Sequence, residues 1–206
     1  MKTLSRRVDM GAGRPREFDI DQALDRAVQL FWRHGYEGTS IADLTEALGI
    51  TRASLYAAFG SKEALFQRVM DRYESRAGAY RHAAQQATVL EEAIRLLMTG
   101  PVELHGDSRN PQGCLGVQGA LSVSPISQAV RGDLAARRRR GEAGILKRLQ
   151  RAQAEGELQA SARPADLARY LSALIYGMAI LSADGANKKQ LQAVAEIALR
   201  GWPNVR

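Results

Sequence analysis

Residues 39–65 read TSIADLTEALGITRASLYAAFGSKEAL. Gly49 separates two short segments in which apolar residues recur with the helical period of 3.6. Two helices that meet at such a turn need apolar residues at fixed offsets to hold the second helix in place. Four residues stand at these offsets: Leu44, Leu48, Ile50 and Leu55. The stretch therefore predicts a helix-turn-helix unit.

The second segment, residues 52–59, leaves a short polar face once its apolar residues point inward. That face, with the residue before the helix, carries Thr51, Arg52, Ser54, Tyr56 and Ala57. It lacks the mixture of acids and bases typical of a solvated helix. Hydroxyls and a guanidinium suit a helix that enters the major groove of DNA and reaches phosphates or base edges. The alternative is a helical hairpin in a protein core, with the tyrosine packed inside.

Two helix starts beside this unit favour the DNA interpretation. Ser61 and Lys62 open the next helix, so free N–H groups and an ammonium lie together where a phosphate can bind. Thr39 and Ser40 offer the same N–H groups at the start of the first segment, without the cation. Each pair is a candidate phosphate contact.

The N-terminal end of the chain is strongly basic. The first sixteen residues hold Lys2, Arg6, Arg7, Arg14 and Arg16 against Asp9 alone. The run GRPR at 13–16 lies directly before the first predicted helix, where Arg14 and Arg16 can reach a minor groove as a flexible arm. Over the whole chain, 29 Lys and Arg face 22 Asp and Glu, giving a net charge of +7. This balance favours a polyanionic partner.

Residues 14–66 resemble the N-terminal domain of the TetR/AcrR family of bacterial transcriptional regulators. The resemblance is carried by GITRASLYAAFGSKEAL: glycine, aliphatic, small polar, basic, then Leu-Tyr, two variable positions, Phe, and Ser-Lys-Glu-x-Leu. One departure is Ala57-Ala58, where family members often carry His or Tyr. We therefore expect DNA specificity to depend more on Arg52, Ser54 and Tyr56.

The resemblance implies an all-α dimer in which the last two long helices of each subunit form a four-helix interface. It also implies a divergent ligand-binding domain behind the DNA-binding head, with a hinge at the fourth helix. We expect a basic arm at 1–16, a helix-turn-helix domain at 17–62 and a ligand-binding and dimerisation domain at 63–206. The implied function is a repressor that binds a palindromic double-stranded DNA operator as a dimer and is released by a small-molecule effector.

The hydrophobic periodicity independently predicts an all-α fold of about nine helices. Capping patterns begin three of them, at Asp19 with Gln22, at Thr88 with Glu91, and at Asn187 with Gln190. The stretch 105–113 predicts a loop by its composition. The expected helices are 20–34, 40–48, 52–59, 62–86, one from 88 that breaks at Gly100-Pro101, 114–121, 124–155, 164–183 and 187–200.

The helix expected at 164–183 is apolar nearly all round, which requires burial on several sides. In a chain of this size, a partner subunit is a natural reason for that burial. The predicted dimer interface lies on this helix and the next. It comprises Leu171, Leu174, Ile175, Met178, Leu181, Leu191, Val194 and Ala198.

Candidate effector-binding residues follow from periodicity, which does not separate an apolar pocket from an apolar core. They are Leu97, Cys114, Val117, Leu121, Leu146, Tyr170 and Leu174. Cys114 also carries an alternative function. It stands at an expected helix start, where a thiol becomes more reactive, so the same scaffold could be a thiol-based redox or electrophile sensor. The usual role of a free cysteine is that of a small buried hydrophobe.

The sequence gives no support for several other classes of protein. The basic start is followed by no apolar segment typical of a secretory signal, and no stretch is long enough to cross a membrane. A single cysteine excludes an internal disulfide, so we expect a cytoplasmic protein. No His or Cys pair has metal-ligand spacing, no catalytic set is visible, and we expect no cofactor. The run Arg137 to Arg140 points all round its helix and is expected to be solvated.

Overall fold

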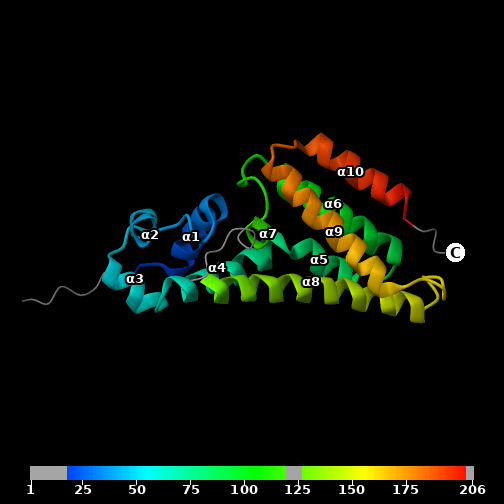
Figure 1. Cartoon of the computed structure of the whole chain (residues 1–206), viewed down its shortest axis with the longest axis horizontal. Helices are drawn as coiled ribbons and strands as arrows, with labels where there is room; N and C mark the ends of the chain where they lie inside the picture. The colour runs from blue at the N-terminus through cyan, green and yellow to red at the C-terminus, as the bar shows by residue number, and fades with distance from the viewer. Residues whose placement is uncertain (1–17, 119–126, 203–206) are drawn as a thin grey trace, which may run out of the picture.

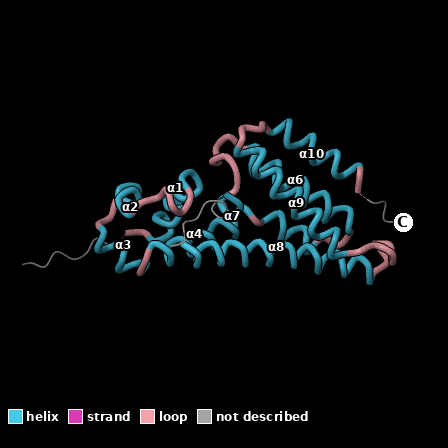
Figure 2. Tube along the Cα trace, viewed as in Figure 1, coloured by secondary structure: helices cyan, strands magenta, loops and turns pink. Residues whose placement is uncertain are grey.

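The computed structural model describes residues 18–118 and 127–202 of the 206-residue chain. All regular secondary structure in these two ranges is helical (Figures 1 and 2). The ten helices are α1 (Ile20–His34), α2 (Ile41–Leu48), α3 (Arg52–Phe59), α4 (Lys62–Ala77), α5 (Ala79–Gln86), α6 (Leu90–Gly106), α7 (Leu115–Gln118), α8 (Gln128–Ala154), α9 (Pro164–Ala183) and α10 (Lys188–Arg200).

Local side-chain caps explain where several helices begin. Asp19 accepts hydrogen bonds from the backbone N–H groups of Asp21 and Gln22, and so caps α1. Ser40 with Asp43 and Asn187 with Gln190 form reciprocal capping boxes at α2 and α10. The caps predicted at Asp19 and Asn187 are therefore confirmed, although Gln22 donates its side-chain amide to Asp19 and does not close a box.

The core of the N-terminal half joins α1, α2 and α3 to one side of α4. Phe31, Leu44, Leu55 and Phe66 are fully buried there, and the Phe31 and Phe66 rings meet edge to face at 5.0 Å. Gly49 turns the chain between α2 and α3 with φ +69° and ψ 31°, a left-handed conformation that a glycine adopts without strain. The predicted helix-turn-helix is thus present as α2 and α3.

A second core holds the C-terminal half together. It is built by α5, α6, α8, α9 and α10, with Leu97, Met98, Met178 and Leu191 at its centre. In Figure 1 the small head of α1 to α3 lies at one end of an elongated molecule, and α8 runs along one side beneath α5 and α9. The helix α4 leads from the head into the second half.

The structure corrects two expectations about helix continuity. The helix predicted at 62–86 is two helices, because Gly78 takes φ −90° and ψ 0° and ends α4 by donating to Glu74 O. The expected break at Gly100-Pro101 does not occur, and α6 runs through both residues. A Cβ at Gly100 would overlap the Tyr80 ring, so the glycine provides close contact between α5 and α6.

Two helix starts also differ from expectation. Helix α6 begins at Leu90 after Val89, and no side chain of its own segment caps it, so the predicted Thr88 cap is wrong. Glu157 accepts the Leu90 N–H group in its place. The expected start of the long basic helix at 124–125 lies outside the described residues. No helix in the described ranges is both long and apolar enough to cross a membrane.

Candidate nucleic-acid interface and the cavity behind it

The exposed face of α3 carries the residues predicted to read DNA. Leu55 and Phe59 are buried against the head, which leaves Thr51, Arg52 and Tyr56 exposed on the opposite side. The Arg52 guanidinium lies 5.6 Å from the centroid of the Tyr56 ring, one turn further along α3. This cation–π pair holds the guanidinium at the start of the helix, where the free N–H groups also point outward.

Thr51 and Ser54 are hydrogen-bonded to each other and also face outward. Thr51 Oγ1 accepts from the Ser54 N–H at 3.1 Å, and the two hydroxyl oxygens lie 2.9 Å apart. Thr51 therefore caps α3, while Ser54 is only half-exposed. Both hydroxyls lie near the N-terminal end of α3, which is the end that would enter a groove of DNA.

The starts of α2 and α4 carry the other predicted DNA contacts of the head. Ser40 is exposed and caps α2, and Ser61 caps α4 by accepting from the Ala64 N–H at 3.1 Å. Lys62 Nζ lies 4.3 Å from the centroid of the Tyr36 ring, and burial lowers the pKa of this half-buried lysine. The Tyr36 ring and the start of α4 therefore fix the position of the Lys62 ammonium.

Thr39 does not fit the predicted role. It is 0% exposed, and its hydroxyl donates to Gly35 O at 2.7 Å. The side chain fastens the connection between α1 and α2 and has no free surface for a phosphate. Arg14 and Arg16, the predicted arm contacts, lie outside the described residues.

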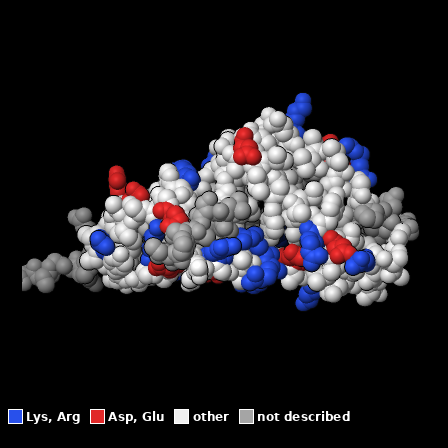
Figure 3. All heavy atoms as spheres, viewed as in Figure 1, with Lys and Arg blue, Asp and Glu red and all other residues white. Residues whose placement is uncertain are grey.

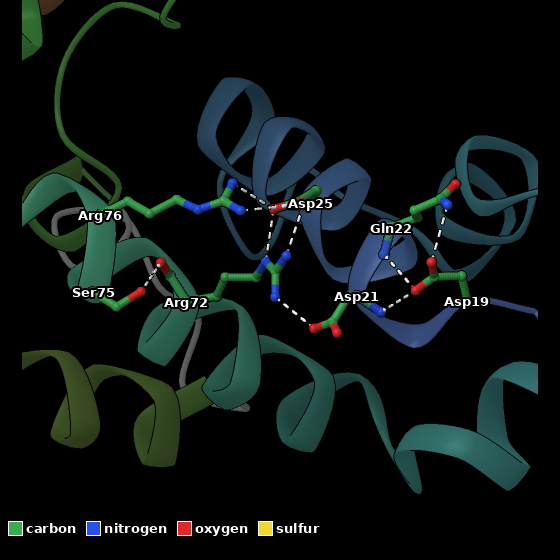
Figure 4. A network of polar contacts seen from close by, with 7 residues as sticks. All are labelled: Asp19, Asp21, Gln22, Asp25, Arg72, Ser75 and Arg76. Carbon is green, nitrogen blue, oxygen red and sulfur yellow. Dashed lines mark hydrogen bonds and ion pairs between the residues drawn. The ribbon is translucent and has the colours of Figure 1, made fainter.

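An ion-pair cluster that was not predicted from the sequence fixes α1 on α4 (Figure 4). Arg72 contacts Asp25 at 2.6 Å and Asp21 at 2.7 Å, and Arg76 contacts Asp25 at 2.6 Å. The hydrogen bond from Arg72 holds the pKa of Asp25 below its usual value of 3.8. A signal for this cluster is present in the sequence. Asp21 and Asp25 on α1 are four residues apart, as are Arg72 and Arg76 on α4.

A second cluster joins α4 to α8. Arg137 pairs with Asp71 at 2.8 Å, Glu74 at 2.8 Å and Asp133 at 2.7 Å, and its side chain is only 8% exposed. The expectation of a solvated arginine run is therefore wrong for this residue. Arg139 and Arg140 are exposed, as predicted. Figure 3 shows basic side chains gathered over the middle of the molecule, in the region of α8.

A cavity lies behind the head, where α4 and α5 meet α6, α7, α8 and α9. The volume that the centre of a water molecule can occupy in this cavity is about 50 Å³. The total volume free of protein atoms, including the opening to solvent, is about 540 Å³. Met70, Tyr73 and Ala77 of α4 form one wall. The cavity thus touches the helix that carries the head.

Only part of the predicted ligand-binding set lines this cavity. Cys114 and Val117 do so. Leu97, Leu146 and Leu174 pack in or against the C-terminal core, while Tyr170 is 44% exposed on the surface of α9. Leu121 lies outside the described residues. Ile175, expected at the dimer interface, lines the cavity.

Polar groups in the cavity are few and mostly engaged. The Tyr73 hydroxyl donates to Cys114 Sγ at 3.2 Å, and burial raises the pKa of this tyrosine. His105 is 8% exposed, its Nδ1 has no hydrogen-bond partner, and burial lowers its pKa to about 4. Within the described residues, no group of three or more His, Cys, Asp or Glu side chains is arranged to hold a metal ion.

The predicted dimer-interface residues divide into two groups. Leu171, Ile175, Met178, Leu191 and Ala198 are buried inside their own protomer, so they have no side-chain surface to offer a partner. Leu174 and Val194 are half-exposed, and Leu181 is 43% exposed. Tyr170, Ile180 and Ile197 are exposed apolar residues on the same two helices.

Comparison with known proteins gives one family. Residues 23–69, from α1 into α4, match the family described as bacterial regulatory proteins, tetR family. The chain is 37% identical over 201 residues to the HTH-type transcriptional repressor ComR of Escherichia coli (strain K12), covering 96% of this chain and 95% of ComR. Over 61 residues it is also 51% identical to the HTH-type transcriptional repressor BdcR of the same organism, a match that covers 30% of this chain and 31% of BdcR.

Solved structures agree with this placement. The chain is similar to the TetR family transcriptional regulator CifR, in a cysteine mutant complexed with 26-bp double-strand operator DNA. The TM-score is 0.87 at 41% identity, and the match covers 92% of this chain and 100% of that chain. The similarity includes the head, α4 and the helical C-terminal half.

Proposed function

The chain belongs to the TetR family of bacterial regulatory proteins, and we propose that it is a repressor that binds a palindromic operator as a homodimer and leaves it when a small molecule binds. The observation that carries the proposal is the exposed start of α3, where Thr51, Arg52 and Tyr56 face outward together. The operator-bound CifR structure and the repressor ComR, both similar over nearly the whole chain, support it. Such a protein acts in the cytoplasm, where bacterial DNA lies.

Some residues of the head would contact DNA bases, and others would contact phosphates and so orient the head on the duplex. Arg52 can donate two parallel hydrogen bonds to a guanine edge in the major groove, and the Tyr56 ring contacts its guanidinium. Thr51 and Ser54 offer hydroxyls to bases or phosphates beside it. Ser40 and Lys62, at the starts of α2 and α4, suit phosphates on either side of the groove. The basic arm at 1–16, with Arg14 and Arg16, would add a minor-groove contact.

We expect Arg52→Ala and Lys62→Ala each to weaken operator binding about tenfold. Loss of Lys62 removes one phosphate contact, so the slope of log affinity against log salt should fall by about 1 whatever the DNA sequence. Loss of Arg52 should weaken the operator more than random DNA. Fluorescence anisotropy with both DNAs, over a salt series, measures these effects.

Arg139→Ala is the matched control, because Arg139 is an exposed arginine on α8, away from the head. It should bind the operator like wild type. Unchanged operator affinity in a double variant that lacks both Arg52 and Lys62 would remove the DNA-binding role from this face.

The dimer would form through the apolar surface that α9 and α10 leave uncovered. Tyr170, Leu174, Ile180 and Leu181 lie along one side of α9, and Ile197 lies on α10. Pairing two copies over this surface would place two heads on successive half-sites, about 34 Å apart on one side of the duplex. We assign dimerisation to residues 63–206 and DNA binding to residues 17–62.

Release would run through α4, which belongs to both halves of the molecule. Its residues Arg72 and Arg76 hold α1, and its residues Asp71 and Glu74 hold Arg137 of α8. A ligand in the cavity would contact α4 through Met70 and Tyr73. To release DNA, the ligand must favour the protomer arrangement that fits the operator poorly, by about 1 to 3 kcal/mol.

The thiol sensor is the alternative on the same scaffold, and Cys114 decides between them. Because the buried Tyr73 hydroxyl donates to its sulfur, Cys114→Ser keeps an acceptor while Cys114→Ala removes it. We expect Cys114→Ser to bind the operator like wild type and Cys114→Ala to lose about 1 to 2 kcal/mol of folding stability. Thermal unfolding and anisotropy measure both. Rapid alkylation of wild type near pH 6 that frees the operator, absent in Cys114→Ser, would establish the sensor.

A further inference from the structure

Arg81, the third residue of α5, is a cation that the cavity holds without an acidic partner. Its Nε donates to the Tyr80 hydroxyl at 3.0 Å, and its guanidinium carbon lies 5.5 Å and 5.9 Å from the Tyr80 and Tyr176 ring centroids. Among the described residues, no carboxylate forms an ion pair with it. Both terminal nitrogens are therefore left for another partner.

Two of the three arginines that line the cavity, Arg81 and Arg138, form no ion pair with a carboxylate among the described residues. Glu74 is the one acidic residue among the described residues that line it, and Arg137 holds that carboxylate at 2.8 Å. Arg138 also lines the cavity, and it donates to a backbone oxygen, Gly116 O, at 2.8 Å. A half-buried cation without a counter-ion loses part of its hydration, so such a site favours an anion from solution.

His105 also lies in the cavity wall, on α6, and is 8% exposed. Its Nδ1 has no hydrogen-bond partner, and its ring donates a hydrogen bond to the Gly113 backbone. Because a neutral imidazole has one N–H, Nδ1 then carries no proton and does not serve as a donor. Arg81 is therefore the donor that the cavity offers an anion.

We propose that the cavity binds a small organic carboxylate, with Arg81 as its counter-ion. A planar carboxylate matches the two terminal nitrogens of a guanidinium. The organic body of the ligand would lie against Met70, Val117 and Ile175. The space of about 50 Å³ restricts it to a small molecule. This inference rests on the proposed function, because it names the chemical class of the effector.

Matched carboxylates and amides test the proposal on the full-length protein without DNA. The probes are acetate against acetamide and benzoate against benzamide, at equal ionic strength adjusted with sodium chloride. The acid of at least one pair should raise the melting temperature progressively with concentration, and its amide should not. The apparent affinity should fall at least about tenfold in Arg81→Gln and remain in Arg139→Gln. The proposal is overturned if no acid exceeds its amide, or if Arg81→Gln responds like wild type.

A second measurement needs no ligand. Arg81→Met removes the charge and keeps an apolar chain of similar length between the two tyrosines, so it should raise the melting temperature in ligand-free buffer. Arg139→Met, an exposed arginine on α8, should leave the melting temperature unchanged. A lower melting temperature in Arg81→Met than in wild type would show that the charge stabilises the empty protein, and would overturn the proposal.

Operator binding separates this inference from the proposed function. In the absence of carboxylate, Arg81→Gln should bind the operator like wild type. Operator binding by wild type with no carboxylate response refutes the effector class alone. A wild-type protein that binds carboxylate but no operator refutes the repressor and leaves the cavity assignment standing.

Discussion

Replacing Leu181 and Ile197 by glutamate is expected to convert the proposed homodimer into folded monomers. Leu181 on α9 is 43% exposed and Ile197 on α10 is 63% exposed, so each glutamate remains hydrated in the monomer. In the proposed dimer each carboxylate would be buried against apolar groups, which costs several kcal/mol. The dissociation constant should rise by about a thousandfold or more.

Size-exclusion chromatography with light scattering measures the mass, and circular dichroism measures the fold. Ile20→Glu is the control, because Ile20 is an apolar residue of similar exposure, 43%, on α1 in the head. It should remain a dimer. A wild-type protein that is monomeric at micromolar concentration, or a double variant that stays dimeric, would contradict the assigned surface.

Arg137→Met is expected to destabilise the fold by about 3 kcal/mol. Arg137 is the common partner of Asp71, Glu74 and Asp133, so its loss leaves three carboxylates facing one another. The effect stays near the lower end of the range for a broken buried pair, because Asp71 and Glu74 keep much of their hydration. The connection between α4 and α8 should loosen.

Denaturant unfolding at neutral pH gives the free energy, and hydrogen exchange locates the change. Arg139→Met, two residues further along α8 and exposed, should lie within about 0.5 kcal/mol of wild type. Faster exchange in α4 should accompany the loss. If Arg137→Met is as stable as Arg139→Met, the ion pairs do not hold α4 on α8.

The head was predictable because its determinants are local. Gly49 between two amphipathic segments, with caps at Ser40 and Thr51, specifies α2 and α3 within twenty residues. Thr39 shows the limit of this reasoning. A hydroxyl before a helix start can face a phosphate or a neighbouring carbonyl, and only the packing of α1 shows that it donates to Gly35 O.

The second half was less predictable because its partners are far apart in sequence. The helix α9 is apolar nearly all round chiefly because α6, α8 and α10 of its own protomer cover it, so Met178 is fully buried without a partner subunit. The cavity brings Arg81 of α5 beside Tyr176 of α9, 95 residues later, and periodicity carries no information about such a pair. Helical spacing also does not separate Leu97, in the core, from Val117, at the cavity.

Hydroxyl-radical footprinting of the DNA upstream of the chain's own gene tests the central claim, that two copies bind an operator through α3. The account predicts two protected patches on one face of the duplex, about one helical turn apart. Both patches should weaken together in Arg52→Ala and disappear in the Leu181→Glu, Ile197→Glu double variant. Protection of a single patch, or protection that Arg52→Ala leaves unchanged, would contradict the account.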